Sequence, residues 1–159
     1  MKHNTKSIFL PLLLSLLFLS SWKIQNPPKE QKAVKACIEQ LFNGMRAGDS
    51  SIVSAVMHPK IRMQTVLVRE GKTILQEGSA EKFLKAVGTP HDMVWDERIF
   101  SYEIKVDGAM ATAWTEYAFY AGEAFSHCGV NAFQFFKDDE KGWLITQIID
   151  TRRKEDCKK

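Results

Sequence analysis

The stretch that decides the fold is residues 110–152, which read MATAWTEYAFY, AGEAFS, HCGVNAFQFF, KDDEKG and WLITQIIDTR in order. Three of these segments are rich in aromatic and β-branched residues, as strands usually are. The two segments between them are short and polar or contain glycine, as turns do. The pattern predicts a three-strand antiparallel meander.

Three helices are predicted before this meander. Residues 30–47 carry apolar side chains at the i, i+3, i+4, i+7 spacing of a helix buried on one side. Asp49 is suited to cap a second, short helix that runs to about Met57, with His58 at the corner and Pro59 ending it. Ser79 is suited to cap a third helix, which ends at Gly88.

Further strands are predicted between and after these helices. Residues 61–69 and 72–77 flank Glu70-Gly71, which is typical of a two-residue hairpin turn. Residues 93–106 are predicted to form one long strand, and Asp107-Gly108 is typical of the two-residue turn that would join it to the meander. Helices followed by long antiparallel strands are typical of the α+β class. We expect a cone-shaped domain in which a curved, mixed or antiparallel sheet of about six strands wraps around three helices and leaves an internal cavity.

Several segments resemble one known superfamily. They are the helix end RAGD, the corner MHP, the helix start EGSAEKF, and the strands AWTEYAFY, SHCGVNAFQFF and GWLITQIIDTRR. Over residues 30–151 the chain resembles the nuclear transport factor, ketosteroid isomerase and polyketide-cyclase-like superfamily, and its small bacterial "lumazine-binding" branch in particular. The resemblance implies the cone-shaped fold. It leaves the activity open, because this superfamily includes isomerases, dehydratases, binding proteins and structural modules.

The N-terminus predicts export. Lys2, His3 and Lys6 precede an apolar run from Ile8 to Leu19, which is the layout of a secretory signal peptide. The run is shorter than the roughly 20 residues of a membrane span, so we expect cleavage after Ser21, with an uncleaved anchor as the alternative. The expected organisation is a signal peptide (1–21), a linker (22–29), the domain (30–152) and a solvated basic tail (153–159) of a periplasmic or secreted protein.

The net charge bears on which partners the protein binds, and the cysteine content bears on disulfide formation. Removing two lysines with the signal peptide lowers the net charge from +3 to +1, which offers no electrostatic case for nucleic acid. Of the three cysteines, Cys37 lies on an apolar helix face. Cys128 and Cys157 are the attractive pair for an exported protein, but the expected register brings Cys128 nearer to Thr151, so the pairing stays open.

Strand pairing assigns side chains to two sheet faces. With odd pairing sums at all three hairpins, the first face holds Trp95, Ile99, Trp114, Glu116, Tyr120, His127, Asn131, Phe133, Ile148, Asp150 and Arg152. The second holds Phe100, Tyr102, Ile104, Tyr117, Phe119, Val130, Phe136, Trp143, Ile145 and Ile149. The first face mixes aromatic and polar groups, as small-molecule pockets do, and is assigned to the cavity. The second is either the core under the helices or the interface of a homodimer.

The predicted ligand-binding residues are Trp95, Trp114, Glu116, His127, Asn131, Asp150 and His58. Glu116, His127 and Asp150 are also candidate catalytic residues, because a carboxylate in an apolar cavity has a raised pKa that suits proton transfer. The alternative is structural: Asp150 pairs with Arg152, and His127 bonds to a neighbour or lies at the rim. The sequence has no metal-binding or cofactor motif, so we expect neither metal nor cofactor.

The leading hypothesis is an exported, homodimeric domain that binds a small apolar or aromatic ligand. The first alternative is a cofactor-independent isomerase, dehydratase or cyclase that uses a cavity carboxylate and histidine. The second is a protein-interaction module whose cavity is closed.

Overall fold

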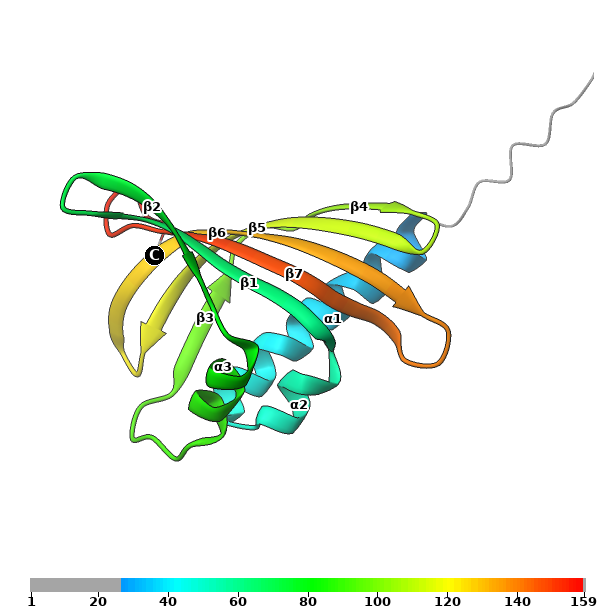
Figure 1. The fold of residues 1–159 in the computed structure, drawn as a ribbon, viewed down its shortest axis with the longest axis horizontal. Coiled ribbons are helices and arrows are strands. Elements are labelled where there is room, and N and C mark those ends of the chain that lie inside the picture. Colours follow the sequence, from blue (N-terminus) through cyan, green and yellow to red (C-terminus); the bar gives the residue numbers. More distant parts are fainter. Residues whose placement is uncertain (1–26, 159) are drawn as a thin grey trace, which may run out of the picture.

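Three helices cover one face of a curved seven-stranded sheet in the computed structural model, which describes residues 27–158 (Figure 1). The helices are α1 (Pro27–Ala47), α2 (Ser50–Ala55) and α3 (Ala80–Gly88). The strands are β1 (Met57–Arg69), β2 (Lys72–Glu77), β3 (Trp95–Ile99), β4 (Glu103–Asp107), β5 (Met110–Ala121), β6 (Ala124–Asp138) and β7 (Gly142–Arg152). The α+β prediction is confirmed.

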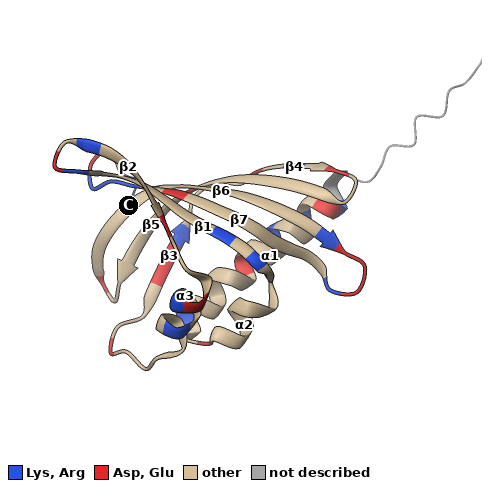
Figure 2. Ribbon diagram, in the orientation of Figure 1, with Lys and Arg blue, Asp and Glu red and all other residues tan. Residues whose placement is uncertain are grey.

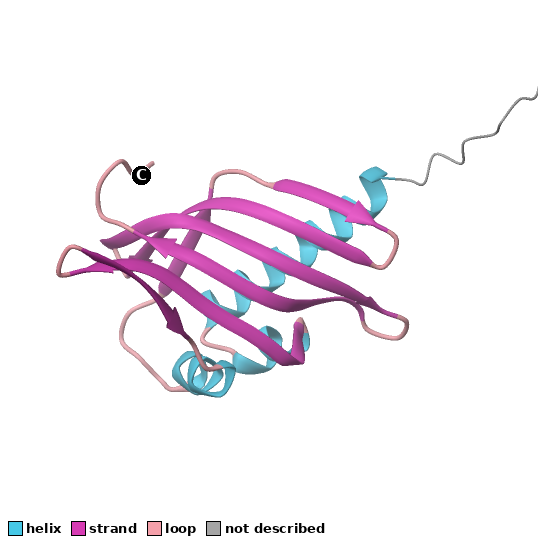
Figure 3. Ribbon diagram, turned by 45° about the horizontal axis from the view of Figure 1, so that its top comes forward, coloured by secondary structure: helices cyan, strands magenta, loops and turns pink. Residues whose placement is uncertain are grey.

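The sheet has the order β2-β1-β7-β6-β5-β3, and β4 pairs with the remaining length of β5. The first and last long strands, β1 and β7, run parallel, and all other pairs are antiparallel. Helix α1 crosses behind the sheet (Figure 3) and contacts β3, β4 and β7. The helices therefore lie together on the concave face, which we call the inner face, and leave the other, outer face without a helix.

The core fills the space between α1 and the inner face. Its fully buried large side chains include Ile38 and Leu41 on α1, Phe133 and Phe135 on β6, and Ile145 on β7. The predicted apolar stripe of the first helix is thus the buried stripe of α1. Removing these side chains from water is the main stabilising contribution to such a layered fold.

The helix caps follow the sequence closely. The side chain of Asp49 accepts hydrogen bonds from the backbone of Ser51 and Ile52, and the Ser79 hydroxyl accepts one from Lys82. Each cap satisfies amide groups that have no partner within the first turn of a helix.

Four element boundaries differ from the prediction. Helix α1 begins at Pro27, so Pro27–Lys29 belong to its first turn and not to a linker; proline is tolerated there because first-turn amides need no partner within the helix. The second helix ends at Ala55, and His58 and Pro59 lie within β1. The β1–β7 pairing is interrupted between Met57 and Arg62, so the missing amide of Pro59 costs no ladder bond.

The other two differences concern strand number and the tail. The predicted strand 93–106 is two strands, because one extra residue interrupts the pairing with β5 between Ile99–Tyr117 and Glu103–Trp114. This raises the strand number from about six to seven. The tail is largely exposed, as predicted, but a disulfide between Cys128 and Cys157 also holds it to the sheet. The predicted signal peptide and most of the predicted linker lie outside the described residues. No helix among residues 27–158 is long and apolar enough to cross a membrane.

Candidate functional site

A pocket of about 420 Å³ lies between the inner face of the sheet and helices α1 and α3. Most of its wall is apolar, because each of the surrounding elements turns its buried side chains toward it. The apolar lining consists of Leu41, Phe42, Met45, Met63, Phe83, Ala86, Trp95, Phe119, Phe133 and Ile148.

Polar side chains gather along the sheet side of this pocket. They are Glu97 on β3, Tyr117 on β5, His127 and Asn131 on β6, and Asp150 and Arg152 on β7. Strand pairing places these groups side by side. Asn131 on β6 is the strand partner of Asp150 on β7 and of Thr115 on β5. Phe119 on β5 lies between its two strand partners, Glu97 on β3 and His127 on β6. We call these six residues the polar cluster.

Glu97 is the most perturbed acid of the cluster. Its Oε1 accepts a hydrogen bond of 2.7 Å from Nδ2 of Asn131. The side chain of Glu97 is partly buried, and it lines the pocket. Burial raises the pKa of Glu97 from 4.5 to about 7; the negative charge of Asp150 adds to this effect, and the bond from Asn131 opposes it. Glu97 therefore changes charge near neutral pH.

Both carboxylate oxygens of Asp150, by contrast, accept hydrogen bonds. Its Oδ1 accepts a 2.5 Å bond from the Thr65 hydroxyl, and its Oδ2 accepts bonds from Tyr117 (3.2 Å) and from Nε of Arg152 (2.7 Å). The pairing with Arg152 is the structural role that the sequence left open for Asp150. These bonds tie β1, β5 and β7 together at the polar end of the pocket.

His127 is neutral in its place on β6. Burial lowers the pKa of His127 to about 4, and the positive charge of Arg152 acts in the same direction. Its ring packs against Phe119 and Tyr117, with centroid distances of 5.1 and 5.7 Å, and its Nδ1 lies 3.0 Å from the Ser126 hydroxyl. Its neutral ring adds no positive charge to the cluster.

Four of the seven predicted ligand-binding residues line the pocket. Trp95, His127, Asn131 and Asp150 lie in its wall, and two of the three catalytic candidates are among them.

The other three predicted residues lie elsewhere. Trp114 and Glu116 are on the outer face: Trp114 is 49% exposed, and Glu116 contacts Ser101 and Lys158. They were misplaced because one extra residue, Ser126, bulges between the pairs Phe119–His127 and Tyr120–Phe125, and a shift of one residue exchanges the two faces of a strand. His58 packs edge-on against Phe136 near the start of β1, away from the polar cluster.

On β3 and β5, three residues of the pocket wall were missed. Tyr117 and Phe119 were placed on the second face by the same shift. Glu97 had a usable signal, because it lies midway between Trp95 and Ile99, which were both assigned correctly to the cavity face. Among the described residues no group of three or more His, Cys, Asp or Glu side chains is arranged to hold a metal ion.

Comparisons with known proteins identify the fold. No protein-family model and no curated protein sequence matches the chain. Among solved structures, the chain is similar to a nuclear transport factor 2-like superfamily protein from Salmonella enterica serovar Typhimurium, with a TM-score of 0.62 and 14% identity over 81% of this chain and 94% of that one. A proposed dehydratase of the same family from Streptomyces avermitilis has a TM-score of 0.59 and 13% identity over 79% and 97% of the two chains.

A proposed ketosteroid isomerase from Shewanella frigidimarina is also similar, with a TM-score of 0.54 and 14% identity over 74% of this chain and 94% of that one. The chain thus has the nuclear transport factor 2-like fold, which the sequence resemblance implied. At these identities the likeness concerns the fold alone.

Proposed function

We propose that this protein binds a small, mostly apolar molecule in the pocket between α1, α3 and the inner sheet face. The observation that carries the proposal is the division of the pocket into a long apolar wall and one polar end. Sites for small organic molecules usually have this composition, in which apolar walls supply affinity and a few polar groups fix orientation. The pocket also counts against the interaction-module alternative, which requires a cavity closed by side chains.

The test is to identify what the protein carries when it is purified from cells. Protein purified without denaturation is extracted with organic solvent, and the extract is compared by mass spectrometry with that of two variants. Ala86→Trp places an indole in the pocket, whereas Ala33→Trp adds the same group to the exposed side of α1. A compound present in wild type and Ala33→Trp but absent from folded Ala86→Trp supports the proposal; equal extracts from all three oppose it.

A second candidate function is acid–base catalysis with Glu97 as the proton-transfer group. The raised pKa of Glu97, about 7, suits a group that must both take and release a proton near neutral pH. Two structures of the same fold are a proposed dehydratase and a proposed ketosteroid isomerase. In this alternative Glu97 replaces the predicted base Glu116, which lies on the outer face.

Proton exchange tests the catalytic alternative. Enolisable ketones with apolar bodies are incubated with the protein in deuterium oxide, and loss of their α-protons is followed by NMR. Catalysis by Glu97 predicts exchange that Glu97→Gln abolishes and Glu116→Gln retains. Exchange that survives in Glu97→Gln rules out this role for Glu97.

We also propose that the protein acts outside the cytoplasm. The disulfide between Cys128 and Cys157 supports this, because such bonds persist in oxidising compartments. Cell fractionation and the mass of the mature chain test it: an exported protein has lost its first residues, and a full-length chain in the cytoplasm contradicts export.

A further inference from the structure

Three uncharged hydrogen-bond donors in and beside the polar cluster already have acceptors. The Asn131 amide donates to Oε1 of Glu97 and lies 3.5 Å from the Thr115 hydroxyl, which is its other acceptor. The hydroxyls of Thr65 and Tyr117 donate to Asp150. A ligand that enters the pocket with only acceptor groups therefore finds no unused donor among these side chains.

The carboxylate of Glu97 keeps one charged acceptor unused. The only hydrogen bond of the Glu97 carboxylate uses Oε1. Within residues 27–158 no buried side-chain nitrogen or oxygen lacks a partner, so the second oxygen of Glu97 has accessible surface, and Glu97 lines the pocket. The polar cluster thus offers this carboxylate oxygen as an acceptor, and the charged donors that remain free are the guanidinium N–H groups of Arg152 that Asp150 does not use.

The charges of the cluster favour a positively charged donor. Asp150 and Arg152 form an ion pair and largely cancel each other, and His127 carries no charge at neutral pH because its pKa is about 4. Ionised Glu97 is then the net charge of the pocket. A cation placed there forms a charge-assisted hydrogen bond in surroundings that water does not screen.

The walls nearest to Glu97 suit the same ligand. Phe119 is the strand partner of Glu97, Trp95 lies two residues before it on β3, and both line the pocket. Aromatic faces attract cations and cover apolar bodies equally well.

We propose that the ligand of this pocket is an apolar amine whose protonated nitrogen donates to the free carboxylate oxygen of Glu97 while its hydrocarbon body packs against the aromatic wall. This inference rests on the proposed function and names the chemical class that the site takes. Arg152 is the competing anchor: its side chain is half exposed and retains guanidinium donors that Asp150 does not use. An anionic ligand would bind there instead.

Three probes with one hydrocarbon body separate these cases: phenylpropylamine, phenylpropanol and phenylpropanoate. Their affinities for the full chain are measured by calorimetry near pH 8, where Glu97 is ionised. We expect the amine to bind at least about tenfold more tightly than the alcohol, because charge-assisted bonds exceed neutral ones by that margin. The carboxylate should bind most weakly.

Two variants and one pH change assign the preference to Glu97. Glu97→Gln should bring the amine to within about twofold of the alcohol, whereas Glu116→Gln, which removes an acid from the outer face, should keep the full preference. For wild type the preference should fall below about pH 6, because Glu97 takes up a proton as the pH drops through about 7.

The outcomes that overturn the inference are distinct from failure of the proposed function. Equal binding of amine and alcohol, or tightest binding of the carboxylate, rejects the amine and leaves a binding pocket. A preference for the amine that survives in Glu97→Gln also rejects it. If none of the probes binds and Ala86→Trp carries the same compounds as wild type, the pocket itself is not a binding site.

Discussion

The ionised form of Glu97, which the proposed amine site uses, is unfavourable for folding. The pKa of Glu97 is about 7 in the folded protein and 4.5 in the unfolded chain, so folding disfavours its ionised form. The stability that goes with protonated Glu97 is fully present below about pH 4.5 and is lost as the pH rises to about 7. An acid retained at such a cost is typical of a functional site.

Glu97→Gln should therefore stabilise the protein at high pH. Glutamine keeps the acceptor for Asn131 and carries no charge. At about pH 8 we expect a gain in the free energy of unfolding of about 3 kcal/mol, shrinking toward zero near pH 4.5. Urea unfolding of wild type and variant at both pH values measures it. A difference that does not change with pH would mean that Glu97 ionises normally in the folded state.

At the level of single elements, strand β6 depends on one close approach. A Cβ atom added to Gly129 would lie 1.8 Å from the carbonyl oxygen of Thr151 on β7, well inside van der Waals contact. Only glycine lets the two backbones approach this closely. The approach brings the end of β7, with Asp150 and Arg152, against the strand that carries His127 and Asn131.

Gly129→Ala should accordingly destabilise the protein by more than about 2 kcal/mol, since the clash is with backbone and no rotamer change relieves it. Val130→Ala, a change in the next residue, which points to the outer face, should cost clearly less. Thermal unfolding of both variants decides this. Equal losses would show that the strands separate readily at this point.

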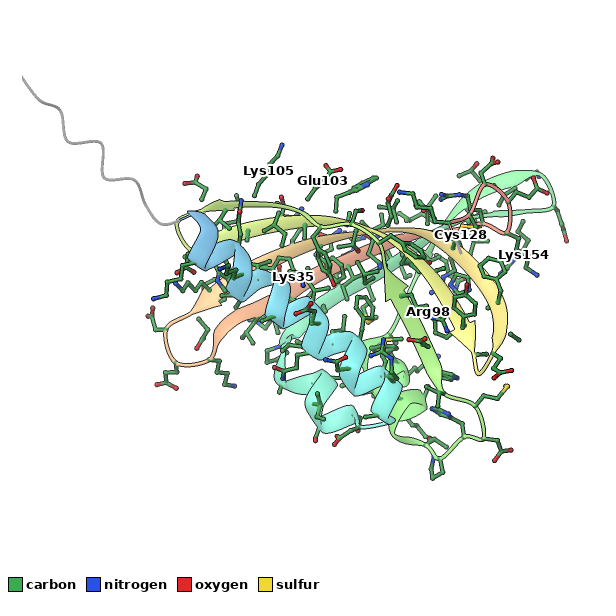
Figure 4. All side chains as sticks on the ribbon, turned by 180° about the vertical axis from the view of Figure 1, so that it is seen from behind. Lys35, Arg98, Glu103, Lys105, Cys128 and Lys154 are labelled. Carbon is green, nitrogen blue, oxygen red and sulfur yellow. A yellow bond between two sulfur atoms is a disulfide. The ribbon has the colours of Figure 1, made fainter. Side chains whose placement is uncertain are left out.

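The tail is a second element whose place depends on one bond. The disulfide joins Cys128 on β6 to Cys157 across a separation of 29 residues, and Lys158 contacts Glu116 on the outer face. Figure 4 shows Cys128 at the end of the sheet where the chain folds back. Linking residues this far apart restricts the unfolded chain more than the folded one.

Cys157→Ser should lower the free energy of unfolding by about 2–4 kcal/mol. Wild type treated with dithiothreitol should then behave like the variant, which separates loss of the bond from loss of the sulfur. Chemical denaturation under oxidising and reducing conditions measures both. If reductant leaves the free energy of unfolding of wild type unchanged, the disulfide does not hold the tail.

The sequence predicts elements better than it predicts register. Caps at Asp49 and Ser79, the buried stripe of α1 and the Glu70-Gly71 turn were all found, because each depends on residues close together in the chain. The stretch AGEAFS read as a loop, since alanine, glycine and glutamate are poor strand formers. In the structure Ala121 pairs with Ala124 around Gly122, which has a left-handed backbone, and Ser126 becomes a bulge.

That bulge explains why the predicted site was half correct. From Gln147 onward, residues of β7 faced β6 as predicted, so His127, Asn131 and Asp150 were assigned to the cavity side. A second bulge at Thr146 puts Trp143 and Ile145 into the core and not on the face of Phe136, where they were predicted. On β5 the faces were exchanged, and Tyr117 and Phe119 took the places predicted for Trp114 and Glu116. A bulge is stabilised by contacts across the sheet, which a short local sequence pattern does not contain.

For the whole molecule, the structure changes which face a homodimer would use. Tyr117 and Phe119 of the predicted interface point into the pocket, whereas none of the helices in residues 27–158 lies over the outer face (Figure 1). Large apolar side chains are exposed there: Met110 at 55%, Trp114 at 49% and Phe136 at 44%. Long stretches of β5 and β6 carry no charge (Figure 2). Glu103 and Lys105 on β4 point away from α1 (Figure 4).

We propose that a second copy of the chain covers this outer face, because several large apolar side chains exposed on one sheet face often mark an interaction surface. In an isologous dimer Glu103 and Lys105 of each copy are available to pair with their opposites at the rim. Such an arrangement leaves the pockets open, since they lie on the other side of the sheet. Trp114→Lys should then convert a dimer into a folded monomer, because it removes a large apolar side chain from the interface and places a charge there.

Light scattering with in-line chromatography measures the mass of each variant, and circular dichroism checks the fold. Met93→Lys is the matched control, because Met93 is also exposed but lies in the loop before β3, away from the outer face. We expect wild type and Met93→Lys to have twice the mass of Trp114→Lys. A wild-type protein that is monomeric at micromolar concentration would contradict the dimer, and a dimeric Trp114→Lys would place the interface elsewhere on the molecule.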